Sequence, residues 1–354
     1  MPYFSLNSQQ LKRNKYIRYW LYSILFLLLV IVLVGGITRM TDSGLSITEW
    51  KPIYGIIPPL NLAQWQQEFF QYQQIAQYKI FNQGMTLEEF KKIFWWEWIH
   101  RFLARLVGFL VIVPLLYFWI TKKLNKALKR RLLFILAIGA LQGFIGWWMV
   151  SSGVGNSSLI FVSHYRLAIH LTFAAVLIFL VFSLACQLIH KNYLFAPKSV
   201  RIGSGIIIFL IIVQIYLGAL VAGLRAGYID TSWPLMTGGF LPADLFPSNP
   251  WWVSLFEDKL TVQFVHRMFA YLLVIIVGWH SFWTSQVVPA SRHSKSALYL
   301  FLVVLLQAII GVCTLLTDIS IEWALLHQLI AFVVLIFAVV HRQIAKGDNI
   351  KILL

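Results

Sequence analysis

The sequence predicts an all-α integral membrane protein, in which eight transmembrane helices form two parallel four-helix-bundle repeats. Three observations predict this fold class: an apolar composition, long apolar runs at regular intervals, and a similarity between the two halves of the chain. Of the 354 residues, 59% are hydrophobic and only 12% are charged. So few polar groups cannot cover the surface of a soluble protein, and we therefore place the chain in a lipid bilayer.

The apolar runs set the number of spans. A helix needs roughly 20 apolar residues to cross a hydrocarbon core about 30 Å thick. Eight runs of this kind lie at 20–37, 101–120, 132–151, 167–189, 203–224, 267–285, 297–316 and 323–341. Because eight is an even number, both termini are expected on the same side of the membrane.

The net charge of +16 indicates an orientation rather than a nucleic-acid partner. Most basic residues gather before the first run, in KKLNKALKRR at 122–131, and at other span ends on the same side. The positive-inside rule assigns that side to the cytoplasm, so both termini are predicted to be cytoplasmic. We expect these residues to contact the lipid bilayer and expect no nucleic acid. Cys186 and Cys313 fall inside predicted spans, and we read both as core residues.

The second half of the chain resembles the first. EWIHR at 97–101 returns as VQFVHR at 262–267, and LQGFIG at 141–146 returns as LQAIIG at 306–311. The external segments match more loosely, GGITR at 35–39 against AGLRA at 222–226. Since four spans bring the chain back to its starting side, the halves enter the membrane in the same direction. The predicted organisation is a cytoplasmic segment at 1–19, a first half at 20–189, a linker at 190–202, a second half at 203–341 and a tail at 342–354.

Four histidines occupy matched positions in this repeat: His100 and His170 in the first half, and His266 and His327 in the second. Each is predicted in the first turn or so of an even-numbered span, at its external end. Ionisable groups in spans are costly and usually mark function. A single histidine there would also fit an interfacial anchor, but four matched ones favour a site. We expect the anchor role instead for the histidines toward the cytoplasmic ends, which are His190, His280, His293 and His341; the role of His164, in an external loop, stays open.

Two histidines in each half favour a haem over a metal ion. Imidazole binds zinc, copper and haem iron, but a zinc or copper site usually has three or four ligands, and no third ligand recurs in both halves. Two axial ligands from facing helices suit a porphyrin. Its propionates would need cations, since buried charges must be paired. Five arginines are candidates on the external side, although each would also fit a headgroup contact: Arg39, Arg101, Arg166, Arg225 and Arg267.

One matched position differs in chemistry between the halves: Glu97 in the first corresponds to Gln263 in the second. Glu97 lies three residues before His100, on the same helical face. A carboxylate can act as a base or stabilise positive charge, whereas a carboxamide does neither well. This asymmetry suggests a cofactor haem in the second half and a reacting haem in the first. The alternative is that Glu97 only favours a helix N-terminus through the dipole.

Several long motifs resemble the haem A synthase family over almost the whole chain from Gly35 to about His341. They are EFKKIFWWEWIHR at 89–101, SHYRLAIHL at 163–171, GALVAGLRAG at 218–227, SWPLMTGG at 232–239, VQFVHR at 262–267 and LLHQ at 325–328. The loop that begins with GGITRMTDSGLS at 35 resembles the mitochondrial and proteobacterial branch, which lacks the paired loop cysteines of the other branch.

The resemblance implies an enzyme that oxidises a methyl group of haem O to a formyl group, through a hydroxymethyl intermediate, to give haem A for terminal oxidases. It implies a haem B cofactor, with its iron held by His266 and His327, and a substrate haem held by His100 and His170. It also implies a catalytic role for Glu97. Further implications are a bacterial cytoplasmic (inner) membrane location, with sites toward the periplasm, a haem O synthase as a partner, and an electron-transfer partner of unidentified kind.

A rival interpretation from another class also fits the composition, the spans and the histidines. This rival is a two-haem membrane cytochrome b that passes electrons to or from quinone. Only Glu97 and the family motifs speak against it. Removal of the Glu97 side chain separates the two: a cytochrome would keep its haems and its electron transfer, whereas a synthase would keep its haems and lose formyl production.

Overall fold

The computed structural model describes residues 8–51, 54–155, 157–189 and 195–347. Within these ranges, eight helices are long and apolar enough to cross a membrane, which confirms the predicted all-α membrane fold. They are α1 (Ser8–Met40), α4 (Leu87–Ile120), α5 (Lys126–Val150), α6 (His164–Gln187), α7 (Lys198–Leu224), α9 (Lys259–Val287), α10 (Arg292–Leu316) and α11 (Ile321–Lys346). Three shorter helices lie in the connecting loops: α2 (Leu62–Gln73), α3 (Ala76–Ile80) and α8 (Ser254–Glu257).

The helices extend past the apolar runs that predict them, because the sequence caps them outside those runs. Helix α4 begins at Leu87, where Thr86 and Glu89 form a capping box that satisfies two free backbone N–H groups. Helix α9 begins after Asp258, whose side chain accepts a hydrogen bond from the Thr261 N–H. Helix α7 begins at Lys198, inside the segment predicted as a linker. Polar turns thus lengthen several helices at their ends.

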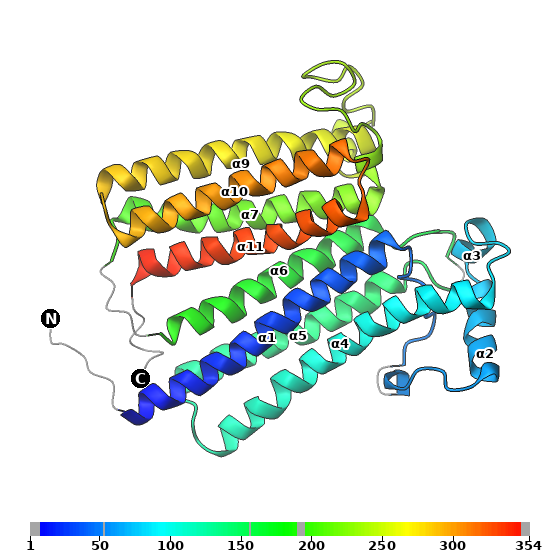
Figure 1. Cartoon of the computed structure of the whole chain (residues 1–354), viewed down its shortest axis with the longest axis horizontal. Coiled ribbons are helices and arrows are strands. Elements are labelled where there is room, and N and C mark those ends of the chain that lie inside the picture. The colour runs from blue at the N-terminus through cyan, green and yellow to red at the C-terminus, as the bar shows by residue number, and fades with distance from the viewer. Residues whose placement is uncertain (1–7, 52–53, 156, 190–194, 348–354) are drawn as a thin grey trace.

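The first four long helices and the last four form two groups that lie side by side (Figure 1). Helices α1 and α6 of the first group pack against α7 and α11 of the second. Gly36 makes part of this contact possible, because a Cβ there would lie 2.8 Å from both the Gln328 amide and Leu325. The Gln328 amide also donates a 2.6 Å hydrogen bond to the Val32 carbonyl, which ties α11 to α1.

Helices α2 and α3 lie at one end of the bundle, whereas the start of α1 and the end of α11 lie at the other (Figure 1). A cluster of apolar side chains packs α2 and α3 onto the start of α4; its buried members are Leu45, Ile47, Tyr72, Ile75, Phe90 and Phe94. This cluster fixes the loop after α1 over the first half. We call this end the loop end.

The two groups differ in how tightly their outer helices pack. Helices α9 and α10 pack against each other along their lengths, whereas α4 and α5 touch only sparsely. In the most apolar 18-residue stretch of α4 and of α5, 11% of the residues are buried. The corresponding share is 33% in α9 and 22% in α10. The first group is therefore more open to the surroundings between α4 and α5.

Candidate functional site

The four matched histidines lie on the second and fourth long helix of each group: His100 on α4, His170 on α6, His266 on α9 and His327 on α11. His100 and His170 are close enough for their charges to interact, and so are His266 and His327. The predicted placement in the first helical turn is wrong. His170, His266 and His327 lie about two turns inside their helices, and His100 lies nearly four turns inside, because the helices begin before the apolar runs; side-chain caps mark these earlier starts in α4 and α9.

Each histidine faces a glycine on the neighbouring odd-numbered span. A Cβ would lie 3.1 Å from His100 at Gly35, 3.0 Å from His170 at Gly146, 3.0 Å from His266 at Gly218, and 2.8 Å from His327 at Gly311. Such distances are tighter than ordinary contact, so any larger residue would push the ring away. The same glycine–histidine contact therefore occurs four times, once in each successive pair of long helices.

These contacts correct the looser match between the external segments. The glycine of α7 that corresponds to Gly35 is Gly218, because both face the first histidine of their half. The match of GGITR with AGLRA is therefore displaced by four residues, about one helical turn. A displacement of one turn leaves the matched residues on the same helical face, so the sequence pattern did not reveal it.

Three of the histidines also contact a glutamine one turn before the glycine. The Nε2 atoms of Gln142, Gln214 and Gln307 lie 3.1–3.2 Å from the ring Nδ1 atoms of His170, His266 and His327, and each also donates to the carbonyl of that histidine. The pattern is Gln-x-x-x-Gly, in which the two residues share one helical face. The sequence contains this pattern four times, three times opposite a site histidine and once more at 343–347. The pattern could have been found there, but LQGFIG and LQAIIG serve in the sequence analysis only as a match between the halves.

Glu97 is buried, with 3% of its surface exposed, and its carboxylate is fully engaged. Oε2 accepts hydrogen bonds from the Ser46 hydroxyl at 2.7 Å and from the Ile47 N–H at 2.8 Å. Oε1 accepts two from the Arg101 guanidinium, at 2.7 and 3.1 Å. Four donors suit an ionised carboxylate. Glu97 thus anchors the loop after α1 and does more than favour a helix end.

The second half anchors its loop with the corresponding pair but without the carboxylate. Gln263 donates a 2.7 Å hydrogen bond to the Asp230 carbonyl, and Arg267 donates to the carbonyls of Asp230 and Ser232. The Gln263 Oε1 atom is buried without a hydrogen-bond partner. The positions of the two anchors match, but only the first half brings an acidic group to its site.

The other arginines predicted near propionates also lie at the loop end. Arg39 donates to the Ala222 carbonyl, and Asp42 forms ion pairs with Arg39 and with Arg225, so that the loops of the two halves are joined. Arg166 donates to the Trp148 carbonyl and lies over the Trp148 ring. All five predicted arginines therefore have protein acceptors, including Arg101 and Arg267.

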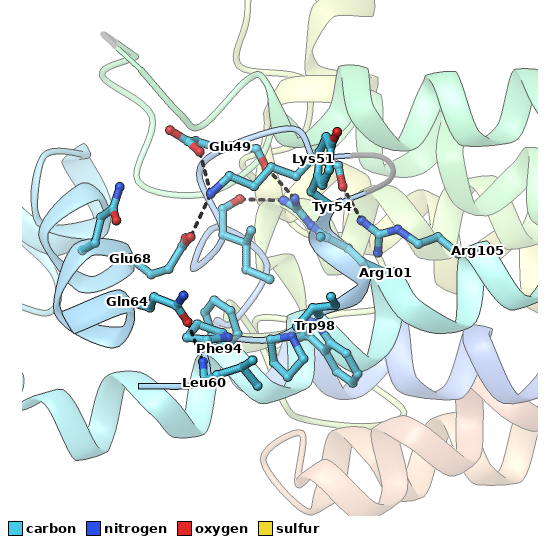
Figure 2. A pocket seen from close by; sticks show the side chains of 16 residues that line it. Glu49, Lys51, Tyr54, Leu60, Gln64, Glu68, Phe94, Trp98, Arg101 and Arg105 are labelled. Atoms are coloured by element: carbon cyan, nitrogen blue, oxygen red, sulfur yellow. Dashed lines mark hydrogen bonds and ion pairs between the residues drawn. The ribbon is translucent and has the colours of Figure 1, made fainter. Parts of the chain in front are cut away.

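A pocket at the loop end is lined by Ile47 and Arg101, two of the residues that bond to Glu97 (Figure 2). Arg101 and Arg105 reach into it from α4, and they donate to the carbonyls of Glu49 and Lys51 respectively. Lys51 in turn forms ion pairs with Glu49 and Glu68. These contacts hold the segment around residues 47–51 close to α4.

Two histidines predicted as interfacial anchors are not anchors. His280 on α9 and His341 on α11 are 7% and 0% exposed, and their Nε2 atoms lie 2.9 Å apart. The Ser296 hydroxyl lies 2.8 Å from the His341 Nδ1 atom. This buried pair links α9, α10 and α11 near the end opposite to the loop end. His293 is partly exposed, and His190 lies outside the described residues.

His164, whose role the sequence left open, is the first residue of α6. Its Nε2 atom lies 3.6 Å from Glu257 in α8, and the neighbouring Tyr165 hydroxyl donates to the same carboxylate. His164 therefore helps to join the two halves at the loop end.

The arrangement fits a flat cofactor held by two nitrogens better than a metal ion held by side chains. In the described part of the chain, no group of three or more His, Cys, Asp or Glu residues is placed to hold a metal ion. The four site histidines are only partly covered by protein, unlike His280 and His341. The glycines clear space beside the rings, and a glutamine orients three of them. Each half can thus hold the iron of a haem through two histidines.

The fold and the site define a class: an α-helical multi-pass membrane protein that carries a pair of matched histidines in each half. A profile of the COX15-CtaA family, described as cytochrome oxidase assembly protein, matches residues 18–339. The chain belongs to this family.

Curated relatives match it over nearly their whole length. A heme A synthase of Brucella anthropi is 52% identical over 343 residues, which cover 97% of this chain and 96% of the relative. A heme A synthase of Brucella ovis is 53% identical over 334 residues, 94% of this chain and 93% of the relative. A heme A synthase of Bartonella tribocorum is 50% identical over 342 residues, 97% of this chain and 96% of the relative.

Proposed function

We propose that this protein is a haem A synthase, which oxidises a methyl group of haem O to a formyl group. The observation that carries the proposal is a 52% identity to a heme A synthase over 97% of the chain. The first oxidation gives a hydroxymethyl group. The second gives a hydrated aldehyde, which loses water to leave the formyl group of haem A. The substrate is haem O, and the product serves terminal oxidases.

The two halves divide the work in this proposal. His266 and His327 hold a haem B cofactor, and His100 and His170 hold the substrate haem. When bound, the haem iron supplies the redox chemistry of the reaction. The support for this division is that only the first half places a carboxylate one turn from a site histidine, whereas the second half has Gln263 there.

Glu97 is the proposed catalytic residue. Its Oε2 atom is fixed by Ser46 and Ile47, so the carboxylate cannot rotate freely. Oε1 is held only by Arg101, and a shift of that guanidinium would release this oxygen to accept a proton or to stabilise positive charge at the reacting methyl carbon. Arg101 and the loop segment it holds would also keep water from the site, because they close over α4 at the loop end.

The arginines at the loop end are proposed to neutralise the haem propionates. Arg39, Arg166 and Arg225 lie at this end, and a guanidinium can bind a carboxylate through two parallel hydrogen bonds. All five predicted arginines, Arg101 and Arg267 included, would share or exchange their present protein acceptors to bind a propionate. We further propose that the loop end faces the periplasm of a bacterial inner membrane, and that a haem O synthase and an electron-transfer protein are partners.

The proposal is tested in a host that makes haem O but no haem A. Haems extracted from its membranes, with and without this gene, are identified by mass and absorbance. Haem A or its hydroxymethyl precursor is expected only with the gene. If the purified, haem-loaded protein carries only unmodified haem B with oxygen and reductant present, the electron-transfer interpretation replaces the synthase.

A further inference from the structure

One of the four site histidines lacks the glutamine that the other three have. Gln142, Gln214 and Gln307 each precede a histidine-facing glycine by four residues. The residue four positions before Gly35 is Ile31, an apolar side chain with no hydrogen-bonding atom. In the part of the chain that the structure describes, no side chain is recorded as hydrogen-bonded to the His100 ring.

The glutamines have an unused acceptor beside each histidine ring. Among the residues that the structure describes, the buried Oε1 atoms of all three glutamines have no hydrogen-bond partner, although their amide nitrogens lie 3.1–3.2 Å from a ring nitrogen. A buried acceptor without a donor costs free energy. A half turn of the amide would present Oε1 to a proton on Nδ1, in exchange for the hydrogen bond that the amide nitrogen now donates to the carbonyl of the same histidine. That tautomer leaves Nε2, the other ring nitrogen, with the lone pair that a metal needs.

The missing glutamine coincides with a different ring orientation. At Gly146, Gly218 and Gly311, the nearest ring atom is Cε1 and the next is Nδ1. At Gly35, the nearest atom of His100 is Nε2, at 3.1 Å, and the next is Cδ2. His100 thus turns its opposite edge, which includes the ligating nitrogen, toward its glycine. A ring without an orienting partner has no hydrogen bond to oppose such a rotation.

We infer that Gln142, Gln214 and Gln307 are positioning residues that hold their histidines ready to bind iron, and that Ile31 leaves His100 as the one ligand able to turn. The bond between iron and His100 is then the bond that opens when haem O enters and haem A leaves. This inference rests on the proposed function.

The test installs the missing glutamine. The protein is purified, saturated with haem B and haem O, and mixed with excess apomyoglobin, which captures each haem as it dissociates. In the natural protein, the first-half haem is expected to leave at least 10-fold faster than the second-half haem, since a partner of a metal ligand typically changes metal affinity about 10- to 100-fold. Ile31→Gln is expected to slow this release about 10-fold. Ile31→Leu, the control that keeps the position apolar, is expected to release haem like the natural protein.

The reciprocal variant tests the same idea in the second half. Gln214→Leu adds no polar group to a membrane helix, so it avoids the folding risk of Ile31→Gln. It is expected to speed haem B release and to shift the electron paramagnetic resonance of the ferric haem, which reports the orientation of the axial imidazole. Equal release rates for both haems, or unchanged release and spectrum in these variants, would overturn the inference and leave the synthase proposal standing. A first half that binds no haem O would contradict the proposed function itself.

Discussion

The two halves of the bundle hold the same histidine–glycine contacts but differ around the first of them. The first half has Glu97 and Ile31 where the second has Gln263 and Gln214. Its outer helices α4 and α5 pack sparsely, whereas α9 and α10 pack closely. In the proposed function, the shared histidines and glycines hold a haem in each half. The acid at Glu97, the apolar Ile31 and the sparse packing of α4 and α5 would then distinguish an exchangeable substrate site from a permanent cofactor site.

The largest effect on haem A formation is expected when Glu97 is replaced by glutamine, the residue that the second half has at the matched position. Glu97→Gln should lower haem A formation by about two to four orders of magnitude, the usual contribution of a general acid or base, while both haems stay bound. The Ser46 and Ile47 donors can still bond to the amide oxygen, so Glu97→Gln keeps a loop contact that Glu97→Ala would lose. Both changes remove the carboxylate partner of Arg101.

For Glu97→Gln, two quantities are measured: the rate of haem A formation and the haem content of the purified variant. The reciprocal change, Gln263→Glu, added to Glu97→Gln serves as the control for position. It should not restore activity, because the acid would then stand at the cofactor site. Activity in Glu97→Gln close to that of the natural protein would remove Glu97 from the mechanism.

A smaller effect is expected when an alanine replaces one of the glycines that face the site histidines. Gly311→Ala would place a Cβ 2.8 Å from His327, so the ring must move, and overpacking of this kind typically costs about 1–3 kcal/mol. We expect a lower thermal midpoint and a changed haem B absorbance spectrum. Gly139→Ala is the matched control, because nothing lies within 4 Å of a Cβ at that position. If both variants kept the natural spectrum, the clearance at Gly311 would not position the ligand.

A change at Gly35 sharpens the comparison between halves. Gly35→Ala would place its Cβ 3.1 Å from His100, which we infer to be the movable ligand. The ring can turn away, so this variant should lose less thermal stability than Gly311→Ala. Haem B retention should be unchanged, because the second half is untouched. Loss of haem B from Gly35→Ala, measured by extraction from the purified protein, would contradict the separation of the two sites.

The smallest effect concerns the pH dependence of the loop over the second half. Although burial alone would raise it, the pKa of Asp230 is lowered, because its carboxylate accepts hydrogen bonds from Ser232 and from the Thr237 N–H. The ionised Asp230 carboxylate therefore stabilises the folded loop. This stabilisation is complete above a pH of about 4, where the aspartate of the unfolded chain is also ionised, and it is lost as the pH falls through the lower pKa of the folded state.

The measurement is pepsin cleavage within the loop, followed from pH 5 downward. Cleavage should increase below about pH 4 in the natural protein. Asp230→Asn should make the loop more susceptible already at pH 5 and should flatten its pH profile. An unchanged profile in this variant would show that Asp230 does not hold the loop.

Sequence reasoning predicted the helices and the site histidines because both leave long-range signals. Membrane spans show in hydropathy, and His100, His170, His266 and His327 show through internal repetition. The helix ends were harder to predict, because caps such as Thr86 lie in polar segments that a hydropathy pattern does not identify as helical. The identity of the loop partners of Glu97 could not be predicted, because Ser46 and Ile47 meet it only through the tertiary fold.

The buried His280–His341 pair shows what a one-dimensional pattern omits. Both residues stand near the ends of apolar runs, where an interfacial anchor is the usual role. Which face of a helix meets its neighbour decides burial, and their rings turn toward each other. The Gln-x-x-x-Gly pattern is visible in the sequence, but its role follows only from the structure, in which Gln214 and Gly218 contact the same histidine.

The identity of the haem that each half retains tests the central claim most directly. The natural protein, His100→Ala and His266→Ala would be purified from a host that makes haem B and haem O, and their haems would be extracted and identified by mass. The account predicts that His100→Ala keeps haem B and loses haem O with its oxidised products, whereas His266→Ala loses haem B. Loss of haem B from His100→Ala, with haem B retained by His266→Ala, would reverse the assignment of the two halves and contradict the account.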